Sequence, residues 1–185
     1  MKIFLFDFAK CNGCYGCQLA CKDEHVDNDW FPIARPQPEL GHFWLKLHEI
    51  VHGQVPKVKV EYRAILCMHC DEPPCAQISD AVYKRADGLV ILDPTKATDK
   101  SVLDACPYHA IYWNEELKIA QKCTGCAHLI DQGEQPRCVD FCPTGALRFG
   151  EESDFIAELV EAETLQPELG TKPRVYYLNS PKLFL

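Results

Sequence analysis

Four cysteines near the start of the chain, Cys11, Cys14, Cys17 and Cys21, have the spacing C-x2-C-x2-C-x3-C. Three thiolates this close together can bind one iron–sulfur cluster, whereas the fourth, about one helical turn later, points away from it. In proteins with two clusters, the fourth cysteine of such a run binds the neighbouring cluster. One run therefore predicts a partner run elsewhere in the chain.

A second run follows at Cys123, Cys126, Cys138 and Cys142, and it ends in the step Cys142-Pro143. If the two runs are partners, each supplies three ligands to its own cluster and one to the other. The ligands of the first cluster would then be Cys11, Cys14, Cys17 and Cys142. The ligands of the second would be Cys21, Cys123, Cys126 and Cys138.

The four remaining cysteines fit a third cluster. Cys67, Cys70 and Cys75 have the spacing C-x2-C-x4-C, which is similar to the start of a run, and Cys106-Pro107 is similar to the end of one. The positions expected for the ligands of a fourth cluster hold other residues, namely Ser79, Lys96, Asp99 and Val102. The spacing therefore predicts three [4Fe–4S] clusters with four thiolates each. Such clusters carry single electrons and offer no open iron to a substrate, so we expect no catalytic residue in this chain.

Disulfides and zinc are the alternative uses of the 12 cysteines. Disulfides require an oxidising compartment, and residues 1–11 contain neither a basic region followed by a long apolar stretch nor a twin-arginine pair. Zinc is a stronger alternative, because two C-x2-C pairs can form one tetrahedral site. However, Cys17 and the two Cys-Pro steps are surplus to such a site, which favours iron–sulfur ligation.

The composition limits the possible partners. The chain has 185 residues and a formal net charge of −8, which argues against a nucleic-acid partner. No apolar segment approaches the ~20 residues that a membrane helix needs, so we expect no direct membrane insertion. Without a signal of its own, the chain is expected in the cytoplasm, or outside it if a signal-bearing partner exports the folded complex.

Short strands and helical turns around the cysteine runs predict an α+β fold with two ferredoxin-like cluster-binding modules. We expect strands at residues 2–8, 43–50, 58–63, 88–92, 110–113 and 146–149, and helical segments at residues 15–25 and 101–105. The first module, with two clusters, would comprise residues 1–27 and 114–150. The second, degenerate module, with one cluster, would comprise residues 67–113, and residues 28–66 would be an inserted loop and strand region.

Residues 151–185 are expected to form a C-terminal helix and tail. Ser153 can cap a helix that carries Phe155, Ile156, Leu159 and Val160 on one face. The tail from Pro167 contains proline and glycine and has no strong period, so we expect it to be extended.

Several residues outside the ligand sets have two interpretations. Basic residues flank the ligands and could raise cluster potentials by offsetting negative charge, or could simply be solvated; they are Lys10, Lys22, Lys122 and Arg137. His69 and His109 adjoin candidate ligands, where a histidine either donates to a cluster sulfur or fills the surface. The insertion concentrates aromatic residues that fit either a core or a patch for a partner, namely Trp30, Phe31, Phe43 and Trp44.

Several strings of the sequence resemble a known family. They are CMHCDEPPC (67–75), VYKRADGLVILDP (82–94), CPYHAIYW (106–113), QKCTGCAHLI (121–130) and CPTGAL (142–147). These strings are similar to the iron–sulfur subunits of molybdopterin oxidoreductases, which usually carry four clusters. Within that family, the segment PELGTKPRVYY (167–177) and the missing fourth site resemble the small subunits of pyrogallol–phloroglucinol transhydroxylases.

The resemblance implies a non-catalytic electron-transfer subunit. It would form a heterodimer, or a multiple of one, with a large catalytic subunit that alone holds a molybdenum bis-pterin cofactor. That partner would act on hydroxylated aromatics by transhydroxylation, hydroxylation or catechol dehydroxylation. The alternatives are an electron-transfer subunit of a respiratory reductase of the dimethyl sulfoxide reductase family and a free polyferredoxin.

Overall fold

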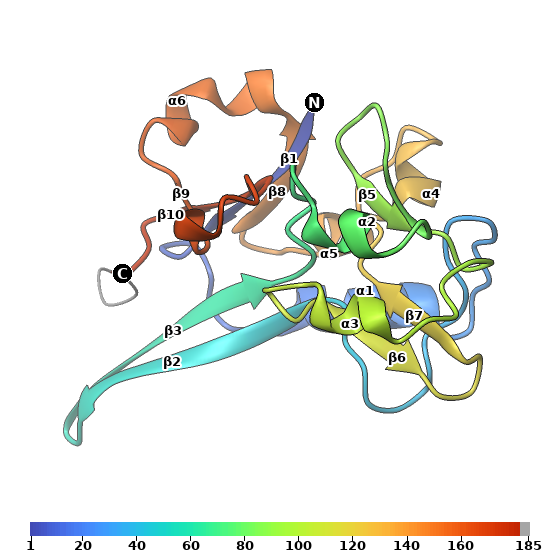
Figure 1. Ribbon diagram of the computed structural model, residues 1–185. Coiled ribbons are helices and arrows are strands. Elements are labelled where there is room, and N and C mark those ends of the chain that lie inside the picture. Colours follow the sequence, from blue (N-terminus) through green and yellow to red (C-terminus); the bar gives the residue numbers. More distant parts are fainter. Residues whose placement is uncertain (182–185) are drawn as a thin grey trace.

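The computed structural model describes residues 1–181 and contains a mixed four-stranded sheet (Figure 1). Its strands, in spatial order, are β8 (Leu147–Glu151), β1 (Lys2–Asp7), β10 (Val175–Leu178) and β9 (Glu163–Thr164). Strand β1 pairs in parallel with β10 and antiparallel with β8. The sheet therefore holds the N-terminal segment next to the C-terminal one.

Strand β1 is buried on both faces, which accounts for its nearly continuous apolar sequence. Ile3 and Leu5 pack with Phe155 in a small cluster on one face. Phe4 and Phe6 belong to the main core on the other face. That core also contains eight of the cysteines, so the cysteine loops are part of the hydrophobic interior.

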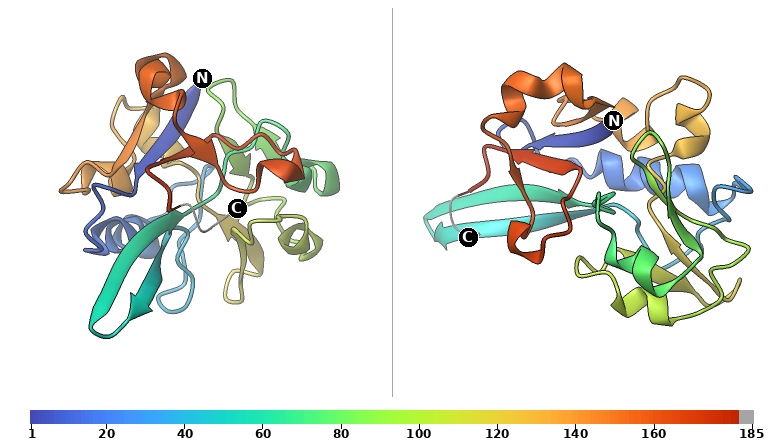
Figure 2. Two further views of the ribbon diagram at one scale, coloured as in Figure 1. Left: turned by 90° about the vertical axis from the view of Figure 1, so that its left-hand side faces the viewer. Right: turned by 45° about the horizontal axis from the view of Figure 1, so that its top comes forward.

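Antiparallel hairpins and short helices form the rest of the molecule. The hairpins are β2–β3 (Lys46–Gln54 and Lys57–Ile65), β4–β5 (Val82–Lys84 and Val90–Leu92) and β6–β7 (Ile111–Asn114 and Ile119–Lys122). The helices in this part of the chain are α1 (Gly16–Val26), α2 (Pro74–Ile78), α3 (Ser101–Asp104), α4 (Ala127–Ile130) and α5 (Arg137–Asp140). The β2–β3 hairpin projects away from the other elements in every view (Figures 1 and 2).

The predicted elements are present, with boundaries that differ by a few residues. The strands expected at 2–8, 58–63 and 146–149 correspond to β1, β3 and β8, and the helix expected at 15–25 corresponds to α1. Strands β4, β7, β9 and β10 were not predicted, because segments of two to four residues are too short to show a period. The aromatic residues of the insertion are divided between the core and the surface. Trp44 is buried in the core, whereas Phe31 is 59% exposed.

The prediction for the C-terminal helix was wrong in its cap and its apolar face. The segment consists of a 3₁₀ turn, η1 (Glu152–Phe155), followed by one turn of helix, α6 (Ile156–Leu159). Glu151 and Asp154 form the capping box, because Ser153 already lies inside the turn. So short a segment buries only one of the expected apolar residues, Phe155, and leaves Ile156 and Val160 exposed.

The tail is extended only in part. It contains a 3₁₀ turn, η2 (Pro167–Leu169), and then the sheet strand β10. The last residues of the predicted tail, 182–185, lie outside the described residues.

Leu5→Ala tests the buried position of strand β1. Leu5 is fully buried, so the substitution removes apolar contacts and leaves a cavity. We expect destabilisation of about 2–5 kcal/mol, measured as a lower thermal unfolding midpoint under anaerobic conditions. Leu40→Ala is the control, because Leu40 is 83% exposed. Equal thermal unfolding midpoints for Leu5→Ala and Leu40→Ala would contradict the buried position of Leu5.

Candidate metal centres

None of the 12 cysteines forms a disulfide, and nine of them are buried. They lie on loops and on the helices α1, α2 and α5, where different parts of the chain meet. We describe them in the three groups that the sequence predicts, as the first set (Cys11, Cys14, Cys17, Cys142), the second set (Cys21, Cys123, Cys126, Cys138) and the third set (Cys67, Cys70, Cys75, Cys106).

The first set joins the loop before α1 to the turn after α5. Cys11 and Cys17 both interact electrostatically with Cys142, which is more than 100 residues away in the sequence. Cys14 is exposed and Cys11 and Cys142 are half-buried, so this set is closest to solvent. Burial raises the pKa of the Cys142 thiol, but hydrogen bonds from the Leu147 backbone and the Thr144 hydroxyl lower it by more.

The second set is buried between helices α1, α4 and α5. Cys21 interacts with Cys123 and Cys126, and Cys138 interacts with Cys126 and Cys21. Burial raises the pKa of the Cys21 and Cys138 thiols, and repulsion from the neighbouring thiolates raises it further. Four such side chains become stable as thiolates only when positive charge is supplied, as by metal ions.

The third set lines a cavity. Cys67 and Cys70 follow β3, Cys75 lies on α2 and Cys106 follows α3. The other lining residues are apolar or aromatic, except for one cation; they are Met68, Pro73, Pro74, Val90, Pro107, Tyr108, Ile111 and Lys122. Four thiols around an apolar cavity are a donor set and a surrounding that fit an iron–sulfur cluster.

In the part of the chain that the structure describes, no group of three or more His, Cys, Asp or Glu side chains is arranged to hold a single metal ion. The four ligands of a [4Fe–4S] cluster bind four different irons, and therefore they need not converge on one point.

A C-terminal strap, residues 171–174, crosses the loop of the third set. The backbone N–H groups of Asp71 and Glu72 donate to the carbonyls of Lys172 and Thr171, at 2.9 and 3.1 Å. The Arg174 N–H donates to the Met68 carbonyl at 2.8 Å. This strap lies inside the string PELGTKPRVYY, so the string contributes to the third set without supplying a ligand.

Side chains of the strap also reach the third set. Thr171 hydrogen-bonds to the thiol of Cys70 and, at 2.5 Å, to the hydroxyl of Tyr108. The guanidinium of Arg174, 7% exposed, forms an ion pair with Asp71, next to Cys70. These contacts could not be predicted from the sequence, because their partners lie 63 to 103 positions apart.

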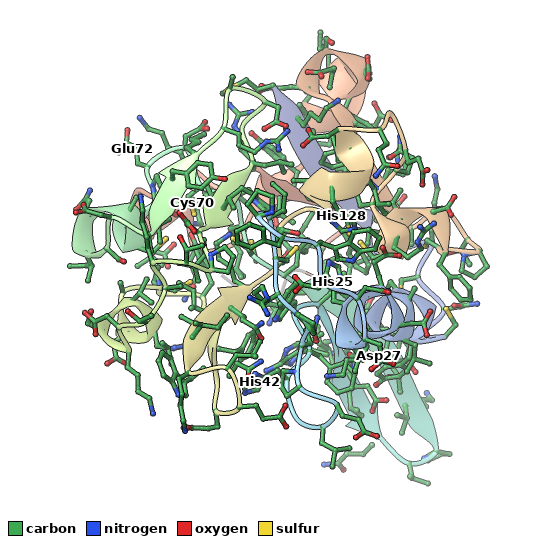
Figure 3. All side chains as sticks on the ribbon, turned by 90° about the vertical axis from the view of Figure 1, so that its right-hand side faces the viewer. His25, Asp27, His42, Cys70, Glu72 and His128 are labelled. Carbon is green, nitrogen blue, oxygen red and sulfur yellow. The ribbon has the colours of Figure 1, made fainter. Side chains whose placement is uncertain are left out.

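A buried polar network encloses the second set. The carboxylate of Glu24 accepts hydrogen bonds from Arg137 Nε at 2.7 Å and His128 Nε2 at 3.1 Å. The Trp30 ring stacks on His128 with 4.2 Å between ring centroids. Figure 3 shows His128 beside His25, on the side of the molecule away from Cys70. Because Glu24 neutralises Arg137, this cation has little charge left to offset that of a cluster.

The positions expected for a fourth cluster take part in packing and turns. Val102 is fully buried in the core. Asp99 accepts a hydrogen bond from the Ser101 N–H at 2.9 Å, and Ser79 Oγ accepts one from the Ala81 N–H at 3.3 Å. Lys96 is 63% exposed and lies 3.9 Å from a carboxylate oxygen of Asp93.

The two histidines beside candidate ligands differ in their surroundings. His109 is exposed, in agreement with a surface-filling role. His69 is 1% exposed, and its Nε2 lies 3.9 Å from the sulfur of Cys123, a member of another set.

Clustered cysteines on loops and short helices, with none in a disulfide, are the donor pattern of an iron–sulfur protein. Residues 58–152 match the family model described as "4Fe-4S dicluster domain". The chain is also 44% identical to the pyrogallol hydroxytransferase small subunit of Pelobacter acidigallici, over 95% of this chain and 67% of that protein.

Two further relatives come from Escherichia coli (strain K12). The chain is 33% identical to the probable anaerobic dimethyl sulfoxide reductase chain YnfG, over 92% of this chain and 87% of that protein. It is 32% identical to a polypeptide of the anaerobic dimethyl sulfoxide reductase, over 97% of this chain and 96% of that protein. The chain therefore belongs to the iron–sulfur subunits of the molybdopterin oxidoreductase family. It is an electron-transfer component rather than a catalytic subunit.

Gly13→Ala tests the geometry of the first cysteine loop. Gly13 has φ of +72°, and a Cβ there would lie 2.1 Å from the Tyr62 ring. The control is Gly145→Ala in the last cysteine loop, with φ of +64° and open space around the added atom. We expect backbone strain of about 1–2 kcal/mol in both variants, and additional loss of stability and of bound iron only in Gly13→Ala. Equal losses of iron in the two variants would contradict this geometry.

Proposed function

We propose that the chain carries three [4Fe–4S] clusters and passes electrons to and from a molybdopterin-containing catalytic subunit. The observation that carries the proposal is the proximity of the thiols, which interact electrostatically within each set and also between neighbouring sets, as Cys21 does with Cys17 and Cys123 with Cys67. The apolar cavity inside the third set supports it further.

Each set would supply the four ligands of one cluster. The first set would hold cluster 1, the second set cluster 2 and the third set cluster 3. When bound, clusters with only thiolate ligands exchange one electron at a time. Hydrogen bonds to sulfur, such as that from Gly125 N–H to Cys123 at 3.4 Å, stabilise the thiolate form.

We also propose a layout of two ferredoxin-like modules. Residues 1–27 and 114–150 form the first, and the pairing of β1 with β8 and the packing of α1 on α5 support their association. Residues 67–113 form the second module, residues 28–66 the insertion and residues 151–185 the C-terminal part. The β6–β7 hairpin crosses the boundary at residue 113 and connects the two modules.

The three sets are connected in the order first, second, third. The first and second meet on α1, where Cys17 and Cys21 are about one helical turn apart. The second and third meet at Cys123, whose thiol accepts a hydrogen bond from the backbone of Cys67. Because Cys14 is exposed, we place electron exchange with the partner at the first set.

The partner we propose is a large subunit that holds a molybdenum bis-pterin cofactor and acts on hydroxylated aromatics, in a heterodimer or a multiple of one. The 44% identity to a pyrogallol hydroxytransferase small subunit supports this substrate class. A respiratory reductase of the dimethyl sulfoxide reductase type is the second candidate. Coverage favours this second candidate. The alignments cover 87% and 96% of the length of two such relatives but only 67% of the length of the hydroxytransferase subunit.

We propose the cytoplasm as the compartment of cluster assembly, because thiols are kept reduced there. A signal on the partner would export the folded complex. Among residues 1–181, no helix has the length and apolar character to cross a membrane.

Purification of the native complex tests the partner. We expect a much larger chain and molybdenum to co-purify with this chain under anaerobic conditions. Product analysis with pyrogallol and other hydroxybenzenes, compared with dimethyl sulfoxide and tetrathionate, separates the two candidates. Conversion of hydroxybenzenes alone supports the first candidate, whereas conversion of the sulfur compounds alone overturns it in favour of the second. A chain that purifies alone and without molybdenum overturns both.

Cys75→Ala tests the assignment of the third set. The variant lacks one ligand of cluster 3, so we expect bound iron to fall by about one third while the paramagnetic signals of the other clusters remain. Ser79→Cys is the companion variant, and it should add no iron because Lys96, Asp99 and Val102 supply no further thiolate. Loss of all three clusters in Cys75→Ala, or about 16 irons per chain in Ser79→Cys, would contradict the assignment.

A further inference from the structure

The four cations that flank the ligands have different surroundings. Lys10 is 50% exposed and lies 3.9 Å from Asp7. Lys22 holds a surface loop, with Nζ donating to the carbonyl of His42 at 3.0 Å. Arg137 is neutralised by Glu24, as described above. The remaining cation, Lys122, is buried.

Lys122 lies at the end of β7, directly before Cys123 of the second set, and is 2% exposed. Its ammonium donates to two carbonyl oxygens, that of Val90 and, at 3.1 Å, that of Cys123. Among residues 1–181 it forms no ion pair with a carboxylate. Its side chain also lines the cavity of the third set. A buried, unneutralised positive charge is costly unless negative charge is nearby, and the thiolates of the second and third sets supply it.

His69 connects the same two sets by a hydrogen bond. It lies between Cys67 and Cys70 in the sequence, but its ring is directed toward Cys123. The N–H of Val90 donates to Nδ1 at 3.0 Å, so Nδ1 is an acceptor and the ring proton is on Nε2. That N–H faces the Cys123 sulfur across 3.9 Å. Val90 thus fixes both side chains, His69 through its N–H and Lys122 through its carbonyl.

We propose that Lys122 and His69 form a junction that raises the reduction potentials of clusters 2 and 3, with Lys122 acting mainly on cluster 3 and His69 on cluster 2. This inference rests on the proposed function. Both are positioning and tuning residues, because neither is a ligand.

The direction of the effect follows from charge. An electron that moves between the two sites oxidises one cluster and reduces the other, and each reduction adds one negative charge. The ammonium of Lys122 stabilises that charge in a region of low dielectric, where it is weakly screened. The His69 N–H stabilises the negative charge on the Cys123 sulfur. Lys122 lines the same cavity as Cys67, Cys70, Cys75 and Cys106, which places its charge beside the third set.

The test is a redox titration of the whole complex, monitored by electron paramagnetic resonance. It compares the native complex with complexes that carry Lys122→Gln or Lys122→Arg. Lys10→Gln is the matched control, because Lys10 likewise precedes the first cysteine of a run but is solvated. In Lys122→Gln we expect the ratio of reduced to oxidised cluster 3, at a fixed ambient potential, to be at least tenfold lower. This change corresponds to a reduction potential lower by about 59 mV for a one-electron couple. The shift should be smaller for cluster 2 and smallest for cluster 1. Lys122→Arg and Lys10→Gln should remain within twofold of the native ratio.

The possible results distinguish a failure of this inference from a failure of the proposed function. Native protein with far fewer than about 12 irons per chain overturns the proposed function itself. Full iron in Lys122→Gln with all three potentials unchanged, or shifted equally, overturns the role of Lys122. If Lys122→Gln does not assemble, His69→Leu replaces it as the test. That variant removes only the donor to Cys123, so the potential of cluster 2 should fall, and an unchanged potential overturns the junction.

Discussion

The fold depends on buried thiols that repel one another once they ionise. Nine of the 12 cysteines are buried. Burial and neighbouring thiolates raise the pKa of Cys17 to about 12 and that of Cys123 to about 11, although hydrogen bonds and Lys122 reduce the effect at Cys123. Metal ions remove this penalty by supplying positive charge. Folding and metal binding are therefore linked, and the clusters we propose would complete an interior to which eight cysteines already belong.

The remaining elements hold the thiol sets in place from distant parts of the sequence. The sheet joins β1 to β8 and β10, which fixes the loops that follow these strands. The strap at residues 171–174 closes the loop of the third set, and Glu24 connects α1 to Arg137 beside the second set. Arg137 beside the second set and Arg174 beside the third are paired with carboxylates, whereas Lys122 forms no such pair among residues 1–181. This difference is the basis of the junction that we propose between the second and third sets.

The sequence was informative where the chemistry is local. Cysteine spacing predicts three ligand sets, because ligation constrains the cysteines of one loop to lie three to five positions apart, and the assignment of each cysteine to its set stays a prediction. The strap, the Glu24 network and the burial of Lys122 could not be predicted, since each depends on contacts between residues far apart in the chain. The cap assigned to Ser153 failed because Glu151 and Asp154 compete for the same turn. For His69, adjacency to a ligand was visible, but its contact with another set was not.

We propose that the twelve cysteines form three complete cluster sites. The decisive measurement is the content of iron, acid-labile sulfide and zinc per chain in anaerobically purified native protein. We predict about 12 irons and 12 sulfides with negligible zinc, from four of each per cluster. Zinc in place of iron, or about eight irons in protein that is fully folded, would contradict the claim.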